Sequence, residues 1–139
     1  MRGTLAVVAL VAFPIGPVAS TLCPETINVH QTASRLPAGW SVSYSKSPVQ
    51  LEIVSLYIGP PKDGVPLGFD AMVNTMDGSV VNWQIPKDSR AYWIKCSYNG
   101  TTLELSKELP RTLSTCVVSL DRQTGTASAQ QHIKALACK

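Results

Sequence analysis

The sequence predicts an all-β protein: a small antiparallel β-sandwich or barrel of about seven strands, held together by two disulfides. Apolar and polar residues alternate in several short segments, as they do in strands with one buried face. Ten prolines and nine glycines divide the 139 residues into short pieces. The dipeptide Asn99-Gly100 lies between two alternating runs and is typical of a tight hairpin.

The expected strands follow one another along the chain. Residues 26–32 and 40–44 are the first two, separated by a turn at residues 36–40. Residues 50–58 are apolar on both faces, so we expect a central strand there. Its two predicted faces are Leu51, Ile53 and Tyr57 on one side and Val54, Leu56 and Ile58 on the other. Residues 59–68 contain three prolines and three glycines, which predicts a long surface loop.

Three further strands are expected in the second half of the chain besides the hairpin. Residues 79–85 place Val81, Trp83 and Ile85 on one face, and Trp83 is expected in the core. Residues 115–120 place Cys116, Val118 and Leu120 on one face. Residues 130–138 fit a strand or a helix. We favour the strand, because a disulfide from Cys138 to Cys23 would tie this segment to the sheet.

The hairpin of residues 92–106 allows a prediction of register. Asn99-Gly100 favours a two-residue type I′ turn, because both residues tolerate positive φ. The inner pairs are then Cys96 with Leu103 and Ile94 with Leu105, on a face that we expect to be buried. Trp93 and Lys95 lie on the opposite face, with Lys95 opposite Glu104 in a cross-strand charge pair.

The first twenty residues are typical of an export signal. Arg2 precedes an apolar run, and Val18-Ala19-Ser20 offers small residues for cleavage after Ser20. The run is too short to span a membrane, which takes about 20 apolar residues. We therefore expect residues 1–20 to be a signal peptide and residues 21–139 to form a single domain in the periplasm or outside the cell.

Four cysteines in an exported chain are expected to form disulfides. We favour Cys23–Cys138, because domain termini are often close together, with Cys96–Cys116 as the second bond. The other two connectivities remain open. A zinc site is not expected, because the chain has no Cys-x-x-Cys and its two histidines, His30 and His132, are far apart.

The charge and the motifs exclude several classes of function. The net charge of +3 is small and scattered, which disfavours nucleic-acid binding. No Gly-x-Ser-x-Gly and no glycine-rich phosphate loop occurs, and no cofactor is expected. The acidic residues that a carboxylate enzyme would need lie beside turn residues, where they usually serve local hydrogen bonds: Asp63, Asp70, Asp77 and Asp88.

Two surfaces are candidates for binding a partner. One is the proline-stiffened loop with Pro60 and Pro61, followed by Lys62 and Asp63 at its tip. The other is the outer hairpin face with Trp93 and Lys95, because exposed aromatic side chains often mark protein contacts.

The chain resembles a small family of exported proteobacterial proteins of unknown function. The resemblance is carried by motifs spread over most of residues 21–139: Cys23-Pro24, Pro37-x-Gly39-Trp40, Tyr57-x-Gly59-Pro60-Pro61, Tyr92-Trp93-x-x-Cys96-x-Tyr98, Leu109-Pro110, Cys116 and Cys138-Lys139. It implies a periplasmic domain with two disulfides. A weaker similarity connects the chain to periplasmic inhibitors of c-type lysozyme, which also have an aromatic-x-x-Cys strand.

We therefore expect an exported binding protein without catalytic activity whose partner is a protein. One specific form is an inhibitor of a peptidoglycan hydrolase, because a cationic tip at Lys62 would suit the carboxylate pair of such an enzyme. The alternatives are an immunity or stress-response protein against a delivered toxin, and an enzyme with an unrecognised carboxylate site.

Overall fold

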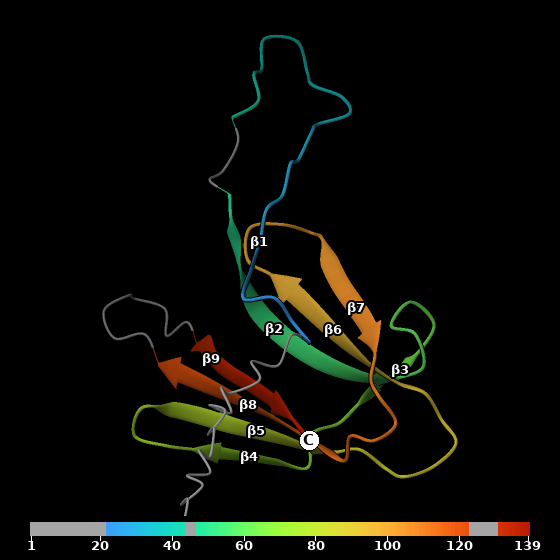
Figure 1. Cartoon of the computed structure of the whole chain (residues 1–139). Coiled ribbons are helices and arrows are strands. Elements are labelled where there is room, and N and C mark those ends of the chain that lie inside the picture. Colours follow the sequence, from blue (N-terminus) through green and yellow to red (C-terminus); the bar gives the residue numbers. More distant parts are fainter. Residues whose placement is uncertain (1–21, 44–46, 123–130) are drawn as a thin grey trace, which may run out of the picture.

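The computed structural model describes residues 22–43, 47–122 and 131–139. Within these ranges the chain is all β, with two antiparallel sheets (Figure 1). The first sheet has the order β1-β2-β6-β7, and β3 also pairs with β2. Its strands are β1 (Thr26–Ile27), β2 (Val49–Ile58), β3 (Val65–Leu67), β6 (Tyr92–Tyr98) and β7 (Glu104–Glu108).

The second sheet has the order β4-β5-β8-β9. Its strands are β4 (Ala71–Asn74), β5 (Gly78–Gln84), β8 (Thr115–Arg122) and β9 (Gln131–Cys138). The expected all-β fold is confirmed, and so are the strands predicted at residues 79–85 and 115–120 and the strand favoured at residues 130–138, of which 131–138 are described. The described residues contain no helix long and apolar enough to cross a membrane.

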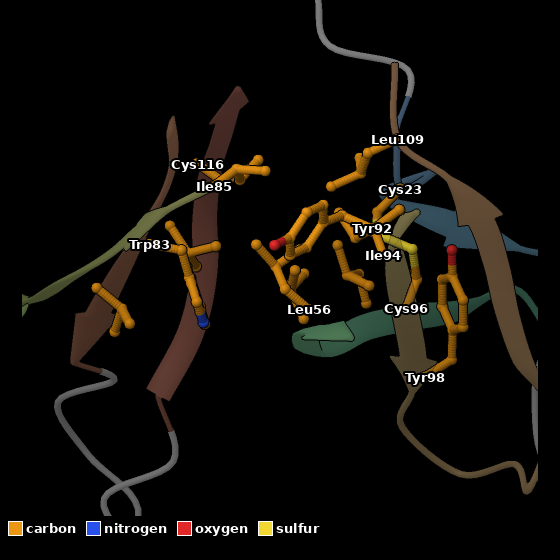
Figure 2. Packing of buried hydrophobic residues seen from close by; sticks show 14 of the residues in the cluster. Cys23, Leu56, Trp83, Ile85, Tyr92, Ile94, Cys96, Tyr98, Leu109 and Cys116 are labelled. Carbon is orange, nitrogen blue, oxygen red and sulfur yellow. A yellow bond between two sulfur atoms is a disulfide. The ribbon is translucent and has the colours of Figure 1, made fainter. Parts of the chain in front are cut away.

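The hydrophobic core lies between the two sheets (Figure 2). Alternate residues of each strand point inward, so Leu56, Ile94 and Cys96 of the first sheet face Trp83 and Cys116 of the second. Their exposed fractions are at most 6%. The core position predicted for Trp83 is confirmed, and its indole N–H donates a hydrogen bond to the carbonyl oxygen of Leu67 at 3.2 Å.

Because β2 contains a bulge, the two faces of this central strand differ from the predicted ones. The pairing with β6 shifts between Leu51 and Ile53. Leu51 before the bulge and Val54 after it are both buried, whereas Ile53 is 54% exposed. A bulge adds one residue to a strand, and every side chain beyond it therefore changes face. The prediction that Leu51 and Ile53 share a face is therefore wrong.

Residues 59–68 are not the long loop that their prolines and glycines predict. The chain turns tightly at residues 59–64 and returns as β3, which pairs with β2 through Leu56–Leu67 and Ile58–Val65. Gly59 has φ +83, and the N–H of Asp63 donates to the carbonyl oxygen of Pro60 at 3.0 Å. Pro66 is compatible with β3 because an edge strand can lack an N–H on its outer side.

The β6–β7 hairpin has a longer connection and another register than the sequence predicts. Asn99 donates its N–H to Gln50 of β2 at 2.9 Å, and only Gly100 of the Asn-Gly pair has positive φ, so no type I′ turn forms. Cys96 pairs with Leu105 instead of Leu103. Because the register shifts by two residues, each side chain keeps its face. Leu103 and Leu105, which were expected in the core, are 50% and 39% exposed.

The disulfides join Cys23 to Cys96 and Cys116 to Cys138, so the favoured connectivity is wrong. Cys116 and Cys138 are directly opposite each other on the neighbouring strands β8 and β9, with 4.1 Å between their Cα atoms. Cys96 belongs to the other sheet. There it binds the N-terminal segment, which the Tyr98 hydroxyl also holds by donating to the carbonyl oxygen of Pro24 at 2.9 Å.

The two strands predicted before residue 49 are largely wrong. Only Thr26 and Ile27 pair with β2, and residues 28–43 contain no strand. These residues, the projecting segment, reach away from both sheets (Figure 1). Trp40 within it is 74% exposed. The last residue of the predicted second strand, Tyr44, and the predicted signal peptide, residues 1–20, lie outside the described residues.

The connections 85–91 and 109–114 are tied together by charged side chains. Lys87 Nζ donates to the carbonyl oxygens of Thr112 and Leu113, at 2.9 Å each. The Asp88 carboxylate accepts hydrogen bonds from Arg90 Nη2 at 2.6 Å and from the Tyr92 hydroxyl at 2.9 Å. The side-chain hydrogen bond from Arg90 is the main reason that the pKa of Asp88 falls from 3.8 to about 2.

The lowered pKa of Asp88 predicts that the folded protein loses stability at acidic pH. A folded-state pKa below the unfolded value stabilises the fold above pH 3.8, and this contribution disappears as the pH falls through about 2. We expect Asp88→Asn to lower the Tm at pH 7, and the difference from the unmodified protein to close across that pH range. Calorimetry at a series of pH values measures it. Asp63→Asn, at an exposed turn, is the control; a gap for Asp88→Asn that persists at pH 2 would contradict the assignment.

The two disulfides should differ in their effect on stability. Their sequence separations are 73 and 22 residues, and the entropy that a bond removes from the unfolded chain grows with the closed loop. We expect removal of Cys23–Cys96 by double alanine substitution to cost about 4 kcal/mol of unfolding free energy, and removal of Cys116–Cys138 about 3 kcal/mol. Urea unfolding measures both. A larger loss for Cys116–Cys138 would show that native-state contacts outweigh loop length.

Candidate functional site

The outer face of the first sheet brings an aromatic pair together. Tyr57 of β2 is opposite Trp93 of β6, and both side chains point away from the core and are half-buried. Pro66 of β3 flanks Tyr57, and Glu108 of β7 flanks Trp93. We call this surface the outer aromatic face. It consists of Pro66, Tyr57, Trp93 and Glu108 in one row, Ser55, Lys95 and Ser106 in the next, and Ile53, Ser97 and Glu104 in the third.

Lys95 is fixed on this face by two neighbours. Its Nζ lies 3.0 Å from Glu104 Oε1 and 5.3 Å from the centre of the Tyr57 ring. Lys95 is directly opposite Ser106, so the ion pair with Glu104 is diagonal and not the direct opposition that the sequence predicts. Ser97, which is opposite Glu104, donates its hydroxyl to the same carboxylate oxygen at 3.1 Å.

The charges of Lys95 and Glu104 stabilise each other. Their mutual hydrogen bond is the main cause both of the raised pKa of Lys95 and of the lowered pKa of Glu104. The Lys95 side chain is only 20% exposed, and its ammonium group lies beside both the Tyr57 ring and the Glu104 carboxylate. The face therefore offers a partner a held cation beside two aromatic rings. An ordered side chain loses little entropy when it enters an interface.

The β2–β3 turn lies at the same end of the sheet as the aromatic pair. It begins two residues after Tyr57, and Gly59 donates its N–H to the carbonyl oxygen of Ala91 at 2.8 Å. Lys62 and Asp63 are exposed at its tip. The structure thus places the predicted residues Pro60, Pro61, Lys62 and Asp63 near the Trp93 end of the outer face, with Lys95 one row farther along.

Tyr57 is the residue of this face that sequence reasoning did not single out. Its position opposite Trp93 depends on the β2–β6 pairing and on the bulge before it. The available signal was the apolar character of both faces of residues 50–58, which indicated a central strand. A central strand has partners on both sides, and this makes Tyr57 a neighbour of an aromatic residue of another strand.

The other predicted candidates do not converge on one catalytic arrangement. Asp70 accepts a hydrogen bond from the Gln84 N–H at 2.5 Å, and Asp88 is engaged by Arg90 and Tyr92. Both carboxylates serve local structure, as their turn positions predict. Within the described part of the chain, no group of three or more His, Cys, Asp or Glu residues could hold a metal ion.

A hollow of about 250 Å³ lies beside Lys87, Asp88 and Arg111. Its charged groups already make hydrogen bonds within the protein. Lys87 donates to carbonyl oxygens, Asp88 accepts from Arg90, and Arg111 donates to the carbonyl oxygen of Ser89 at 3.3 Å. These charged groups therefore hold the connections 85–91 and 109–114 together, and we assign the hollow a structural role. The outer aromatic face remains the better candidate for a partner.

Comparison with known proteins identifies the family. The family model described as Type VI secretion system Tli immunity protein matches residues 44–139. Neither the curated proteins nor the solved structures contain a match to the chain. The matched residues include both sheets except β1, and with them the outer aromatic face and three of the four cysteines. Since the match covers more than half of the chain, this protein belongs to the Tli immunity protein family of the type VI secretion system.

Proposed function

We propose that this protein neutralises an effector delivered by a type VI secretion system by binding it, without catalysing a reaction itself. The family match carries this proposal. It favours the immunity role over the other functions that the sequence left open. The outer aromatic face supplies a suitable contact surface, because tryptophan and tyrosine are enriched among the residues that dominate binding energy.

We infer that the protein acts after export, in the periplasm. Residues 1–20 have the composition of a signal peptide with cleavage after Ser20. All four cysteines are in disulfides, which form and persist in oxidising compartments. Mass spectrometry of the secreted protein tests this inference: a mature N-terminus at Thr21 is expected.

The decisive experiment pairs the protein with the effector encoded beside it. Cells that receive the effector should survive only when the protein is exported, and the purified pair should form a complex that abolishes the effector's activity. Survival that requires no complex would overturn the binding mechanism. Consumption of the effector's product by the purified protein would revive the enzymatic alternative.

The chemical class of the effector is a finer proposal. We propose a peptidoglycan hydrolase of the lysozyme type, because Lys62 at a stiff turn would suit the carboxylate pair in the cleft of such an enzyme. A panel of lysozymes and peptidoglycan hydrolases tests this class by inhibition and calorimetry. Neutralisation of an effector with another activity would retain the immunity function and reject this target.

The outer aromatic face predicts a loss of effector binding on truncation of Trp93. We expect Trp93→Ala to weaken the complex about 30-fold, since truncating a dominant interface residue costs about 2 kcal/mol or more. The Tm should change little, because Trp93 lies outside the core. Titration calorimetry measures the affinity. Trp40→Ala is the matched control on the projecting segment; a larger effect there than at Trp93 would move the binding surface to that segment.

The position of Lys62 at the tip of the β2–β3 turn predicts that its charge affects inhibition of the effector. If Lys62 enters a cleft lined by carboxylates, Lys62→Glu should weaken inhibition about tenfold or more, because like charges then meet. Lys134→Glu changes the net charge equally at an exposed position of β9 and should leave inhibition unchanged. Inhibition curves at low and at physiological salt measure both variants. Equal effects would indicate a general dependence on net charge, and no effect at Lys62 would remove the turn from the interface.

A further inference from the structure

The edge of the second sheet at β4 is open to pairing. All four residues of β4 are exposed, and among the described residues only β5 pairs with it. The N–H of Thr75 donates to the carbonyl oxygen of Gly78 at 2.8 Å, and Val73 pairs with Val80. Because backbone groups alternate in direction along a strand, the N–H and C=O groups of Met72 and Asn74 point away from β5. Figure 1 shows β4 as the outermost strand of its sheet.

The other edge strands carry features that oppose pairing with another chain. β3 contains Pro66, β7 carries Glu104, Lys107 and Glu108, and β9 carries Lys134. β1 is only two residues long. Proline, charged residues and short length are the usual protections of a sheet edge. β4 is also short, but it contains no proline and no charged residue.

The surroundings of β4 are apolar and nearly uncharged. Four large hydrophobic residues within residues 69–76, in β4 and beside it, are exposed, Met76 by 96%, Val73 by 58%, Phe69 by 54% and Met72 by 46%. Asp70 is the only charged residue from 64 to 76, and its carboxylate is held by the Gln84 N–H. Clusters of exposed apolar side chains often mark interaction sites in soluble proteins.

The outer face of the second sheet is uncharged in the two rows that contain Ala71 and Val73, and its next row carries Asp121. Eight positions across the four strands face outward in two rows and include no charged residue: Ala71, Asn82, Val117 and Ala137 in one, and Val73, Val80, Ser119 and Ala135 in the other. The outer aromatic face of the first sheet, by contrast, carries Lys95, Glu104 and Glu108.

We propose that β4 pairs antiparallel with β4 of a second copy of this chain. With a two-fold axis at Val73, Met72 of each copy is opposite Asn74 of the other, so their outward N–H and C=O groups satisfy each other. The two Val73 side chains meet at the axis. No like charges oppose each other there, although the chain as a whole carries a net charge of +3. The same strand thus supplies both sides of the interface.

The contact is small, so we expect a weak dimer. Stable interfaces bury about 800 Å² from each partner, more than a four-residue strand alone provides. Sedimentation velocity should show the mass doubling as the concentration rises from micromolar toward millimolar. Val73→Lys should raise the dissociation constant about tenfold or more, because it places two like charges opposite each other. Leu103→Lys, at a residue 50% exposed in the β6–β7 connection, should not.

A cysteine at the axis gives a second readout. Directly opposed residues in a non-hydrogen-bonded antiparallel pair have Cα atoms about 4.5 Å apart, close enough for a disulfide. Val73→Cys should therefore form a covalent dimer under air oxidation, and Met76→Cys, though more exposed, should do so much less. A protein that stays monomeric throughout, equal cross-linking of the two variants, or a dimer unaffected by Val73→Lys would each overturn the proposal. These outcomes are independent of effector binding. Loss of effector binding in Val73→Lys, in a protein that forms no dimer at any concentration, would instead assign β4 to the effector.

Discussion

The antiparallel pairing of β2 with β6 determines both the core and the candidate site. The same register puts Leu56 beside Ile94 on the inner face, where they are 1% and 0% exposed, and Tyr57 beside Trp93 on the outer face. Alternation along a strand makes the two placements inseparable. A slip of one residue would expose the core pair and bury the aromatic pair and Lys95. Burial of the inner side chains, worth roughly 1.5–3 kcal/mol for each large one, therefore also holds the outer face in place.

The bulge in β2 and the Cys23–Cys96 disulfide extend this arrangement toward the N-terminus. The bulge allows Leu51 to remain buried although Ile53 points outward. Cys96 is buried on the inner face of β6, and its bond fixes the N-terminal segment against the sheet. The projecting segment therefore starts from a fixed base even though its own residues pair with no strand.

Local periodicity predicted the strands at residues 79–85 and 115–120 but also a strand at residues 40–44, where the structure has none over residues 40–43. Residues 79–85 and 115–120 have one buried and one outer face in the structure, as their sequences indicate. The prediction failed where the decisive contacts join distant residues. The proline content of 59–68 hid β3 from the prediction, because β3 depends on its distant partners, β2 and Trp83. Asn99-Gly100 predicted a tight turn, but Asn99 continues the pairing with β2.

The cysteines show the same limit. Their predicted connectivity used distances along the chain and the proximity of termini, whereas the register between β8 and β9 decides that Cys116 meets Cys138. Consecutive strands pair with each other in most sheets, so this bond was open to inference once residues 130–138 were taken as a strand. Of the candidate site, the sequence identified Trp93, Lys95 and the turn. It did not identify Tyr57, which is opposite Trp93 in the sheet and two residues before the turn.

The two sheets present surfaces of different chemistry, and this separation bears on how a small immunity protein could act. The outer aromatic face combines rings with held charges and suits recognition of one specific partner. The β4 edge is apolar and offers backbone groups that accept any strand of suitable geometry, which suits self-association. Because the surfaces lie on different sheets, pairing at β4 leaves both aromatic faces of a dimer available. Two linked binding faces would increase the apparent affinity only for a partner that offers two sites. For an effector with a single site, the benefit of pairing would instead be protection of an edge that otherwise invites aggregation.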